Sequence, residues 1–349
     1  MDATCYKAAT LGDIAAECKL TKATVSRALS GAGLVAPDTR RRIFQVAERL
    51  NYEPNLQARS LAKGRSEFIV LFSAAVFPGV HLKTVESIQA RIIGQGYEMP
   101  LYGFGTHLQT EDNLEKQASA MRSLRQQRPR AVVCHSVNLQ EPALLELERY
   151  VESGGILVCY GHHTDLPVDQ VVIDYEDIAY RSACHLLDLG HRDIGYFATY
   201  IRFRCDYRFP GFCRALRERG VEIREEWIFD GPSFEEGGAW LAERFTKLAK
   251  RPTGMVIVND VAAGIFINEI GRAGFTVPGD VSVIGHDDAP SARYWQPALT
   301  TVRHPVEEVS NCVTEMILAR LDGKMAAPRH HIAYGELVVR ESAAAPRGR

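Results

Sequence analysis

The chain has 349 residues, with 41 Lys and Arg, 43 Asp and Glu, and a formal net charge of −2. This length allows more than one domain. No run reaches the length of about eighteen apolar residues that a membrane helix needs, and the N-terminus lacks the apolar core of a signal peptide. The eight cysteines include no Cys-x-x-Cys pair, which is typical of buried thiols in a reducing compartment. We therefore expect a cytoplasmic protein without a membrane role, and a disulfide-stapled secreted domain is excluded.

Charge is distributed unevenly along the chain. Residues 1–66 hold eleven Lys and Arg against six Asp and Glu, whereas the other 283 residues hold 30 against 37. A basic head concentrates the attraction for phosphates at one end, and an acidic body repels DNA. This asymmetry indicates a nucleic-acid partner for the N-terminal end.

The first thirty residues have the periodicity of a helix-turn-helix. A short amphipathic helix is predicted over 11–17, a tight turn over 18–20, and a second helix that opens at Thr21, a natural N-cap. The residues expected to face inward are Ile14, Ala15, Cys18, Leu20, Val25, Ala28 and Leu29. The outer face of the second helix then carries Lys22, Ala23, Ser26 and Arg27. The helix dipole disfavours a cation at Lys22, so a phosphate or a guanine edge is the better reason for it.

A third helix is predicted from Pro37 to Leu50. Its buried side comprises Ile43, Val46, Ala47 and Leu50, and three arginines, Arg40, Arg41 and Arg42, open it. The alternative is a three-helix bundle used for protein contacts, in which the arginines are only solvated.

Residues 55–63 form a segment too short to be stably helical by itself in water. Pro54 can start a helix there and Gly64 can end it. A leucine flanked by cations on such a conditional helix fits a wedge that enters the minor groove and bends the duplex. The alternative is a plain linker with Leu56 and Leu61 packed on the body.

From Phe68 onward, short apolar runs alternate with amphipathic helical patterns. The runs are 68–73, 98–102, 131–134, 156–160, 171–173, 194–198, 226–229, 255–258, 281–285 and 299–302. This alternation predicts parallel sheets covered on both faces. Because so many strands exceed one comfortable sheet, we predict an α/β body of two doubly wound parallel-sheet subdomains behind an all-α helix-turn-helix headpiece.

Ligand groups in such a fold lie just past the carboxyl ends of strands. These positions hold Ser73, Tyr102, His135, His162, Thr199, Asn259, Asp287 and His304, and Phe77 and Trp295 are further platforms for stacking. Apolar faces combined with hydrogen-bonding groups suit a sugar ring. For Asn259 the alternative is a helix N-cap, and for Asp287 it is a loop carboxylate that answers an arginine.

Motifs for other chemistry are missing from the sequence. It has no Gly-x-Ser-x-Gly elbow, no complete dinucleotide loop, no phosphate-binding lysine motif, and no His-x-x-x-His pair with metal-ligand spacing. We therefore expect a protein that is not an enzyme and that needs no metal or cofactor.

Several stretches, taken in order, resemble the lactose- and galactose-repressor (LacI/GalR) family of transcriptional regulators. Residues 10–29, 51–55 and 60–64 resemble its headpiece and hinge helix, and residues 189–191, 259–260, 281–288 and 299–302 extend the resemblance over nearly the whole chain. The resemblance implies a homodimer that binds pseudo-palindromic operator DNA. It further implies a repressor of a carbohydrate uptake or catabolism operon, released by a small sugar, sugar acid or sugar phosphate. A regulator that depends on a corepressor or a protein partner is the alternative, followed by a sugar-binding module without a DNA role.

The resemblance also implies roles for single residues. Lys22 and Ala23 fall where operator bases are chosen, and Leu61 falls on the intercalating leucine. The full set expected to contact DNA is Thr10, Leu11, Thr21, Lys22, Ala23, Thr24, Ser26, Arg27, Asn55, Ala58 and Leu61. In the body, Arg208 matches the arginine that holds effector hydroxyls or carboxylates, and Phe234 matches a stacking aromatic. With Ser73, Phe77, His162, Asn259, Asp287, Trp295 and His304, they complete the expected effector set.

The resemblance implies domain boundaries as well. The headpiece is expected at 1–54, the hinge helix at 55–65 and the body at 66–340. Within the body, one subdomain is expected at about 66–173 and 305–326, and the other at about 174–304 and 327–340. Residues 341–349 are expected to be a disordered tail.

The chain departs from the family at several places. Lys19 stands where glycine is usual, and Ala36 replaces a capping serine before the third helix. Gly161-His162 replaces an Asp-Arg pair in the pocket, which implies a different effector from those of well-known members. Arg202, Arg204 and Arg208 lie close together in sequence and leave room for an acidic or phosphorylated sugar.

Overall fold

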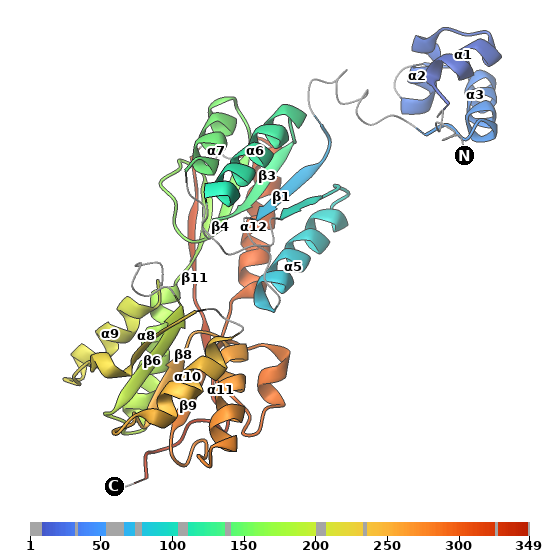
Figure 1. Cartoon of the computed structure of the whole chain (residues 1–349). Coiled ribbons are helices and arrows are strands. Elements are labelled where there is room, and N and C mark those ends of the chain that lie inside the picture. Colours follow the sequence, from blue (N-terminus) through green and yellow to red (C-terminus); the bar gives the residue numbers. More distant parts are fainter. Residues whose placement is uncertain are drawn as a thin grey trace. The chain divides into compact units, whose positions relative to one another are not determined.

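The computed structural model describes residues 9–31, 34–53, 66–73, 79–103, 111–136, 141–199, 207–232, 236–324 and 327–347. Backbone contacts divide the chain into two compact units, Met1–Ser66 and Glu67–Arg349. We call them the headpiece and the body (Figure 1). The predicted hinge segment lies outside the described residues.

The headpiece consists of three helices around a small apolar core. They are α1 (Leu11–Cys18), α2 (Lys22–Ser30) and α3 (Pro37–Arg49). Thr10 and Asp13 form a capping box at the start of α1, and Thr21 caps α2 by accepting a hydrogen bond from the Thr24 N–H. The core contains Ile14, Ala15, Cys18, Val25, Ala28, Ile43, Val46 and Ala47, with Leu20, Leu29 and Leu50 packed against it. The predicted inward faces are thus confirmed.

The two departures in the headpiece have visible structural effects. Lys19 ends α1 in the left-handed region at φ 53°, where a residue with a Cβ pays a steric cost. Ala36 begins α3 without a side-chain cap hydrogen bond. The first-turn amides of α3 therefore lack the partner that serine would supply.

Replacing Ala36 by serine should stabilise the headpiece by about 1 kcal/mol, because the hydroxyl can accept a hydrogen bond from the first turn of α3. Hydrogen exchange of the α1–α3 amides in the full chain across a urea series measures this free energy. Ala36→Val, which adds bulk without an acceptor, is the matched control. An equal response of both variants would rule out capping as the cause.

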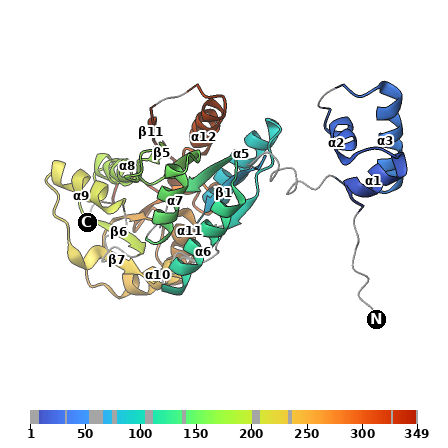
Figure 2. The same ribbon diagram turned by 90° about the horizontal axis from the view of Figure 1, so that it is seen from above.

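The first lobe of the body is a six-stranded sheet among the described residues, in the order β11-β5-β4-β3-β1-β2. Its strands are β1 (Ile69–Ser73), β2 (Leu101–Gly103), β3 (Ala131–His135), β4 (Leu157–Gly161), β5 (Asp169–Ile173) and β11 (His330–Ala333). Helices α5 (Val80–Gly94) and α12 (Val306–Leu321) pack on one face. On the other face lie α6 (Glu111–Gln127) and α7 (Ala143–Glu152), and Figure 2 shows α12 and α6 on opposite sides of this sheet.

The second lobe repeats this plan with the order β12-β10-β9-β8-β6-β7. Its strands are β6 (Ile194–Thr199), β7 (Ile228–Gly231), β8 (Gly254–Ile257), β9 (Ser282–Asp287), β10 (Thr300–Arg303) and β12 (Glu336–Val338). Helix α8 (Tyr175–Asp188) pairs with α9 (Phe209–Glu218), and α10 (Gly237–Lys247) pairs with α11 (Asp260–Arg272). The prediction of two doubly wound subdomains is confirmed.

The predicted boundary near residue 326 is wrong. Strand β11 pairs in parallel with β5 of the first sheet, and β12 pairs antiparallel with β10 of the second. The chain therefore crosses for the last time between Ala333 and Glu336. Both strands are short and largely exposed, so they lack the apolar run by which the other strands were recognised.

The prediction of a disordered tail is also wrong for the part that the structure describes. Ser342 is fully buried, and its hydroxyl donates to the Val283 carbonyl at 2.6 Å. The Ala344 carbonyl lies 2.9 Å from His191 Nε2. Residues 341–344 therefore pack along β9, a tertiary contact that small residues near a terminus do not reveal.

None of the described helices is both long enough and apolar enough to cross a membrane.

Candidate functional site

The outer face of α2 presents the residues predicted to meet DNA. Lys22, Ala23, Ser26 and Arg27 are all exposed, because the opposite side of the helix is held in the core by Val25 and Ala28. The Arg27 Nε donates to the Ala23 carbonyl at 3.3 Å. The helix thus offers two cations and a hydroxyl on one surface, which suits phosphate and base-edge contacts.

The other predicted DNA contacts fall into three groups. Thr10 and Thr21 are exposed but also serve as helix caps, Thr24 is half-buried, and Leu11 packs partly against the headpiece core. Asn55, Ala58 and Leu61 lie outside the described residues. The DNA-contact role of every member of the set stays a prediction.

The body gathers five histidines where its two lobes meet, a group we call the histidine cluster. First-lobe elements supply His81 on α5, His135 at the end of β3 and His162 after β4. The second lobe supplies His286 on β9, and His304 follows β10 where the chain crosses back. Ring centroids lie 4.7 Å apart for His81 and His135, 6.4 Å for His81 and His304, and 6.1 Å for His286 and His304.

Tyr175 and Arg208 join the cluster from the second lobe. The Tyr175 ring stacks on His162 at 4.8 Å, and its centroid lies 6.2 Å from those of His286 and His304. The Arg208 guanidinium sits 4.7 Å above the same tyrosine ring. Its Nε donates to His286 Nδ1 at 3.2 Å, so a neutral His286 carries its proton on Nε2.

Local sequence explains why Arg208 reaches this position. Arg208 is the N-cap residue of α9, and Pro210 stands in the first turn, where its fixed φ suits a helix start. Gly211 lets α9 approach α8 closely, because a Cβ there would lie 1.9 Å from the Glu176 carbonyl oxygen. The same contact brings the start of α9 beside Tyr175, the first residue of α8.

Gly161 plays a comparable part on the first lobe. Its φ is +108°, and a Cβ there would come within 3.0 Å of the His135 ring. The glycine therefore makes room for His135 and turns the chain so that His162 follows. His135 is 2 % exposed, stacks on Tyr160 at 4.8 Å, and its Nδ1 lies 3.3 Å from the Ser73 hydroxyl.

His304 lies at the centre of the cluster. It is 5 % exposed, and neither of its ring nitrogens has a hydrogen-bond partner among the described residues. A buried polar group without a partner costs free energy. The ring therefore marks a place where a polar ligand group would be stabilised.

The carboxylates of Asp260 and Asp288 hold the end of β9 through hydrogen bonds and ion pairs. Asp260 is fully buried and accepts hydrogen bonds from the Thr301 hydroxyl at 2.6 Å and the Ala289 N–H at 2.7 Å. Burial raises the pKa of Asp260 to about 7. Asp288 pairs with Arg303 and Arg340, and these arginines hold its pKa below the usual value although burial opposes them.

Asp287 lies between these groups and faces the cluster. Its backbone has φ 118°, and its carboxylate lies 3.7 Å from His286 Nδ1. Burial, reinforced by the neighbouring Asp260, raises its pKa well above the usual value. Asp288 is a loop carboxylate that pairs with arginines, and Arg208 also acts on the carboxylate of Asp287, so both interpretations of Asp287 stay open.

Four of the five histidines have lowered pKa values and are held neutral by their surroundings. Burial, together with nearby His81 and Arg208, lowers the pKa of His304 and of His162 to about 3 each. Burial, together with the neighbouring histidines and, for His286, Arg208, also takes the pKa of His135 and His286 well below the usual value. Each ring therefore offers one donor and one acceptor at neutral pH.

The structure brings together five of the nine predicted effector residues. They are Ser73, His162, Arg208, Asp287 and His304. The Asn259 side chain caps α11 by accepting from the Ala262 N–H at 2.7 Å, as the alternative interpretation expected. Trp295 lies over Gly264 of α11, where a Cβ would meet its ring at 2.2 Å. Phe77 and Phe234 lie outside the described residues.

Sequence reasoning missed His81, Tyr175 and Tyr207 as members of the site. The ring centroid of Tyr207 lies 4.0 Å from that of His162, and Tyr175 lies two residues past Ile173, the last residue of β5. A search one or two residues beyond each strand end would have found Tyr175. His81 stands in the first turn of α5, and no pattern in the sequence pairs that turn with the end of β3.

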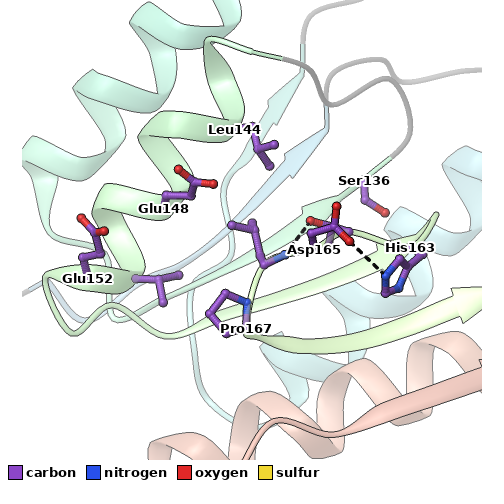
Figure 3. A pocket seen from close by; sticks show the side chains of 10 residues that line it. Ser136, Leu144, Glu148, Glu152, His163, Asp165 and Pro167 are labelled. Carbon is purple, nitrogen blue, oxygen red and sulfur yellow. Dashed lines mark hydrogen bonds and ion pairs between the residues drawn. The ribbon is translucent and has the colours of Figure 1, made fainter.

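The structure also has a surface cavity of about 410 Å³ on the first lobe (Figure 3). It lies on the first lobe between α7 and the loop after β4, and its lining includes Glu148, Glu152, His163 and Asp165. His163 Nε2 is 3.6 Å from the Asp165 carboxylate. None of the predicted effector residues lines this cavity.

Metal binding finds no support within the part of the chain that the structure describes. There, no group of three or more His, Cys, Asp or Glu side chains is arranged to hold a metal ion.

Comparison with known proteins matches both units. Residues 10–55 match the model of bacterial regulatory proteins of the lacI family, and residues 183–343 match the periplasmic binding protein-like domain. The HTH-type transcriptional repressor PurR of Aliivibrio salmonicida is 28% identical over 336 residues, which cover 96% of this chain and 98% of that protein.

Two solved structures illustrate the shared fold. The lac repressor dimer bound to operator and the anti-inducer ONPF has a TM-score of 0.82 at 20% identity, covering 97% of this chain and 100% of that one. The complex of the transcriptional regulator CelR with cellobiose has a TM-score of 0.69 at 23% identity, covering 96% and 100%. At these identities the likeness concerns the fold alone.

Proposed function

Because the chain belongs to the lacI (LacI/GalR) family of bacterial regulatory proteins, we propose that it acts as a homodimer on a pseudo-palindromic operator and is released by a small sugar-like effector. The protein is a DNA-binding transcriptional repressor with a ligand-binding body. We further propose that this homodimer is cytoplasmic, that it has no enzymatic activity, and that its effector is of the sugar class.

The exposed face of α2 is the observation that carries the DNA-binding part. Its cations stand on a helix whose other side is fixed in the headpiece core. The side chains are therefore presented rigidly, as base readout in the major groove requires. The net positive charge of residues 1–66 adds phosphate attraction that does not depend on sequence.

The histidine cluster supports the effector part. It lies past the carboxyl ends of strands from both sheets, where doubly wound folds bind ligands. It combines the aromatic faces of Tyr175 and Tyr207 with the Arg208 guanidinium and the Asp287 carboxylate. Stacking faces and directed polar groups together suit a sugar-like molecule, and the solved structure of CelR holds cellobiose.

Control then follows from differential binding. A ligand shifts an equilibrium only by binding one state better than the other. Groups of the second lobe, Arg208 and Asp287, close on a ligand that rests on His135 and His162 of the first. Closure moves the first lobes of the dimer against each other, separates the two segments at 55–63, and weakens the grip on DNA.

Selection of binding sites from random DNA should yield a short pseudo-palindrome, because two α2 helices related by a twofold axis read two half-sites. Affinity for the selected site should fall steeply with salt, with a log–log slope set by several phosphate contacts. Fluorescence anisotropy across a salt series measures the slope. A consensus without symmetry would contradict the dimer.

The variant Lys22→Ala separates base readout from general attraction. It should change the preferred bases of the half-site, whereas Arg244→Ala, an arginine on α10 of the body that stacks on Trp240, should leave consensus and slope unchanged. An unaltered consensus in the Lys22 variant would remove that lysine from the reading surface.

A further inference from the structure

The histidine cluster is more than a polar pocket for hydroxyl groups. His135, His286 and His304 are 2%, 3% and 5% exposed, although histidine is only moderately inclined to burial. His304 has both ring nitrogens without a partner among the described residues. A neutral sugar can satisfy one donor and one acceptor, but it gives no reason for gathering so many groups that can become cationic.

The fixed charges nearby point to a negative ligand. Arg208 stands at the N-terminus of α9, where the positive end of the helix dipole disfavours a cation and favours an anion. Lys83 of α5 lies close enough to influence the Asp287 carboxylate. Asp287 is the carboxylate that faces these cations, and its pKa is raised, so it tends to give up its negative charge.

Every element packed around His304 contributes a group that bears on its charge. The neighbouring rings are His81 on α5, His286 on β9 and Tyr175 on α8. His135 and His162 approach from the first lobe. The charged groups are Arg208, Lys83, Asp287 and Asp260. Cations and groups that can become cations outnumber the carboxylates.

We propose that the interlobe site takes an anionic small molecule, one that bears a carboxylate or a phosphate, and that this anion binds together with a proton taken up by the histidine cluster. The anionic group lies between Arg208 and His304, and the imidazole that accepts the proton becomes a second charged donor to it. The proposal rests on the proposed function and names the chemical class of its effector.

The linkage has a definite sign. Without ligand, burial and the repulsion of His81 and Arg208 keep His304 neutral. An anion placed among these groups attracts the imidazolium and offsets that repulsion, so it raises the pKa of the ring. Because the complex then holds more protons than the unliganded protein, affinity for the anion increases as pH falls.

Calorimetry on the full chain with paired ligands tests the proposal. The pairs are D-galacturonate with D-galactose and glucose 6-phosphate with glucose, and inorganic phosphate is added as a bare anion. We expect at least one anion to bind more tightly than its neutral partner. Its affinity should rise toward about tenfold for each pH unit between pH 8 and 6. Titration in two buffers of different protonation enthalpy should show uptake of about one proton.

A matched pair of variants locates the proton. His304→Gln keeps a donor and an acceptor but cannot be protonated, so the pH slope of anion affinity should flatten. His330→Gln, at an exposed histidine of β11, should keep the wild-type slope. Proton uptake by the wild type is measured independently, so a variant that fails to fold leaves the first test intact.

Four results would overturn the proposal. They are equal affinity for acids and their neutral partners, anion binding without proton uptake, an unchanged slope in His304→Gln, and a lack of binding by any anion of the panel at pH 6. Operator binding, measured by anisotropy without ligand, reports on the proposed function separately. Normal operator binding, together with a neutral effector whose affinity does not depend on pH, would refute the inference but leave the proposed repressor function intact.

Discussion

Replacing Arg208 by alanine should leave operator binding near the wild-type level while removing the response to effector. The guanidinium contacts Tyr175 and His286, which both belong to the body. Loss of a charge-assisted hydrogen bond to the ligand costs about 2–3 kcal/mol, which corresponds to about thirty- to a hundred-and-fifty-fold in affinity. Operator release by effector, followed by anisotropy, measures the loss.

Arg214→Ala is the matched control, since Arg214 is also on α9 and also lies over a tyrosine, Tyr180, at 4.4 Å. Its ion pairs are with Glu176 and Glu218, which are not members of the cluster. This variant should respond to effector like the wild type. If Arg208→Ala did so too, the site would lie elsewhere. If effector strengthened operator binding, the site would survive and the regulator would work by corepression.

Acid should destabilise the unliganded body between pH 7 and pH 5. The pKa values of His135, His162, His286 and His304 are lowered on folding, so the unfolded chain binds more protons once pH falls below about 6.5. Each such histidine costs up to about 1.4 kcal/mol of unfolding free energy for every pH unit in that window. Urea unfolding across pH, without ligand, measures this slope.

The carboxyl groups whose pKa is raised, Asp260 and Asp287, act in the opposite direction and reduce the dependence of unfolding free energy on pH. Asp260 keeps its proton up to a pKa of about 7, so its contribution to stability is full at low pH and is lost as pH rises. Four histidines with a lowered pKa outnumber two carboxyl groups with a raised pKa, so we expect acid to lower the free energy of unfolding. His304→Gln should make the slope shallower and His330→Gln should not. A wild-type body equally stable at both pH values would show that the cluster is solvated.

Almost all of the headpiece structure could be predicted from its sequence. Its helices, caps and inward faces depend on contacts between residues near in the chain, and the period of the apolar positions predicts which side is buried. Lys19 and Ala36 were recognised as departures, but only the structure shows that Lys19 keeps the left-handed turn at φ 53°. The turn is held because the chain on both sides is already fixed by the core.

The two sheets were predicted from their apolar runs. Of the predicted effector residues that the structure brings together, the strand-end rule found Ser73, His162, Asp287 and His304, and the resemblance to the family supplied Arg208. The apolar runs missed β11 and β12, two short and largely exposed strands whose partners, β5 and β10, are distant in the sequence. At Asn259 the rule found a side chain that caps α11, and its contact with an effector stays a prediction. A polar side chain after a strand satisfies either role until its neighbours are known.

By itself, then, the sequence determined the α2 face, the two doubly wound lobes, and single polar residues at strand ends. Only the tertiary structure decided that histidines from positions 81 to 304 form one cluster, with His304 at its centre. The physical reason is that periodicity records which face of an element is buried, whereas a site between lobes depends on how two sheets and their crossings are stacked. The sequence reflects this packing at Gly161 and Gly211, because each glycine leaves the space that a neighbouring element occupies.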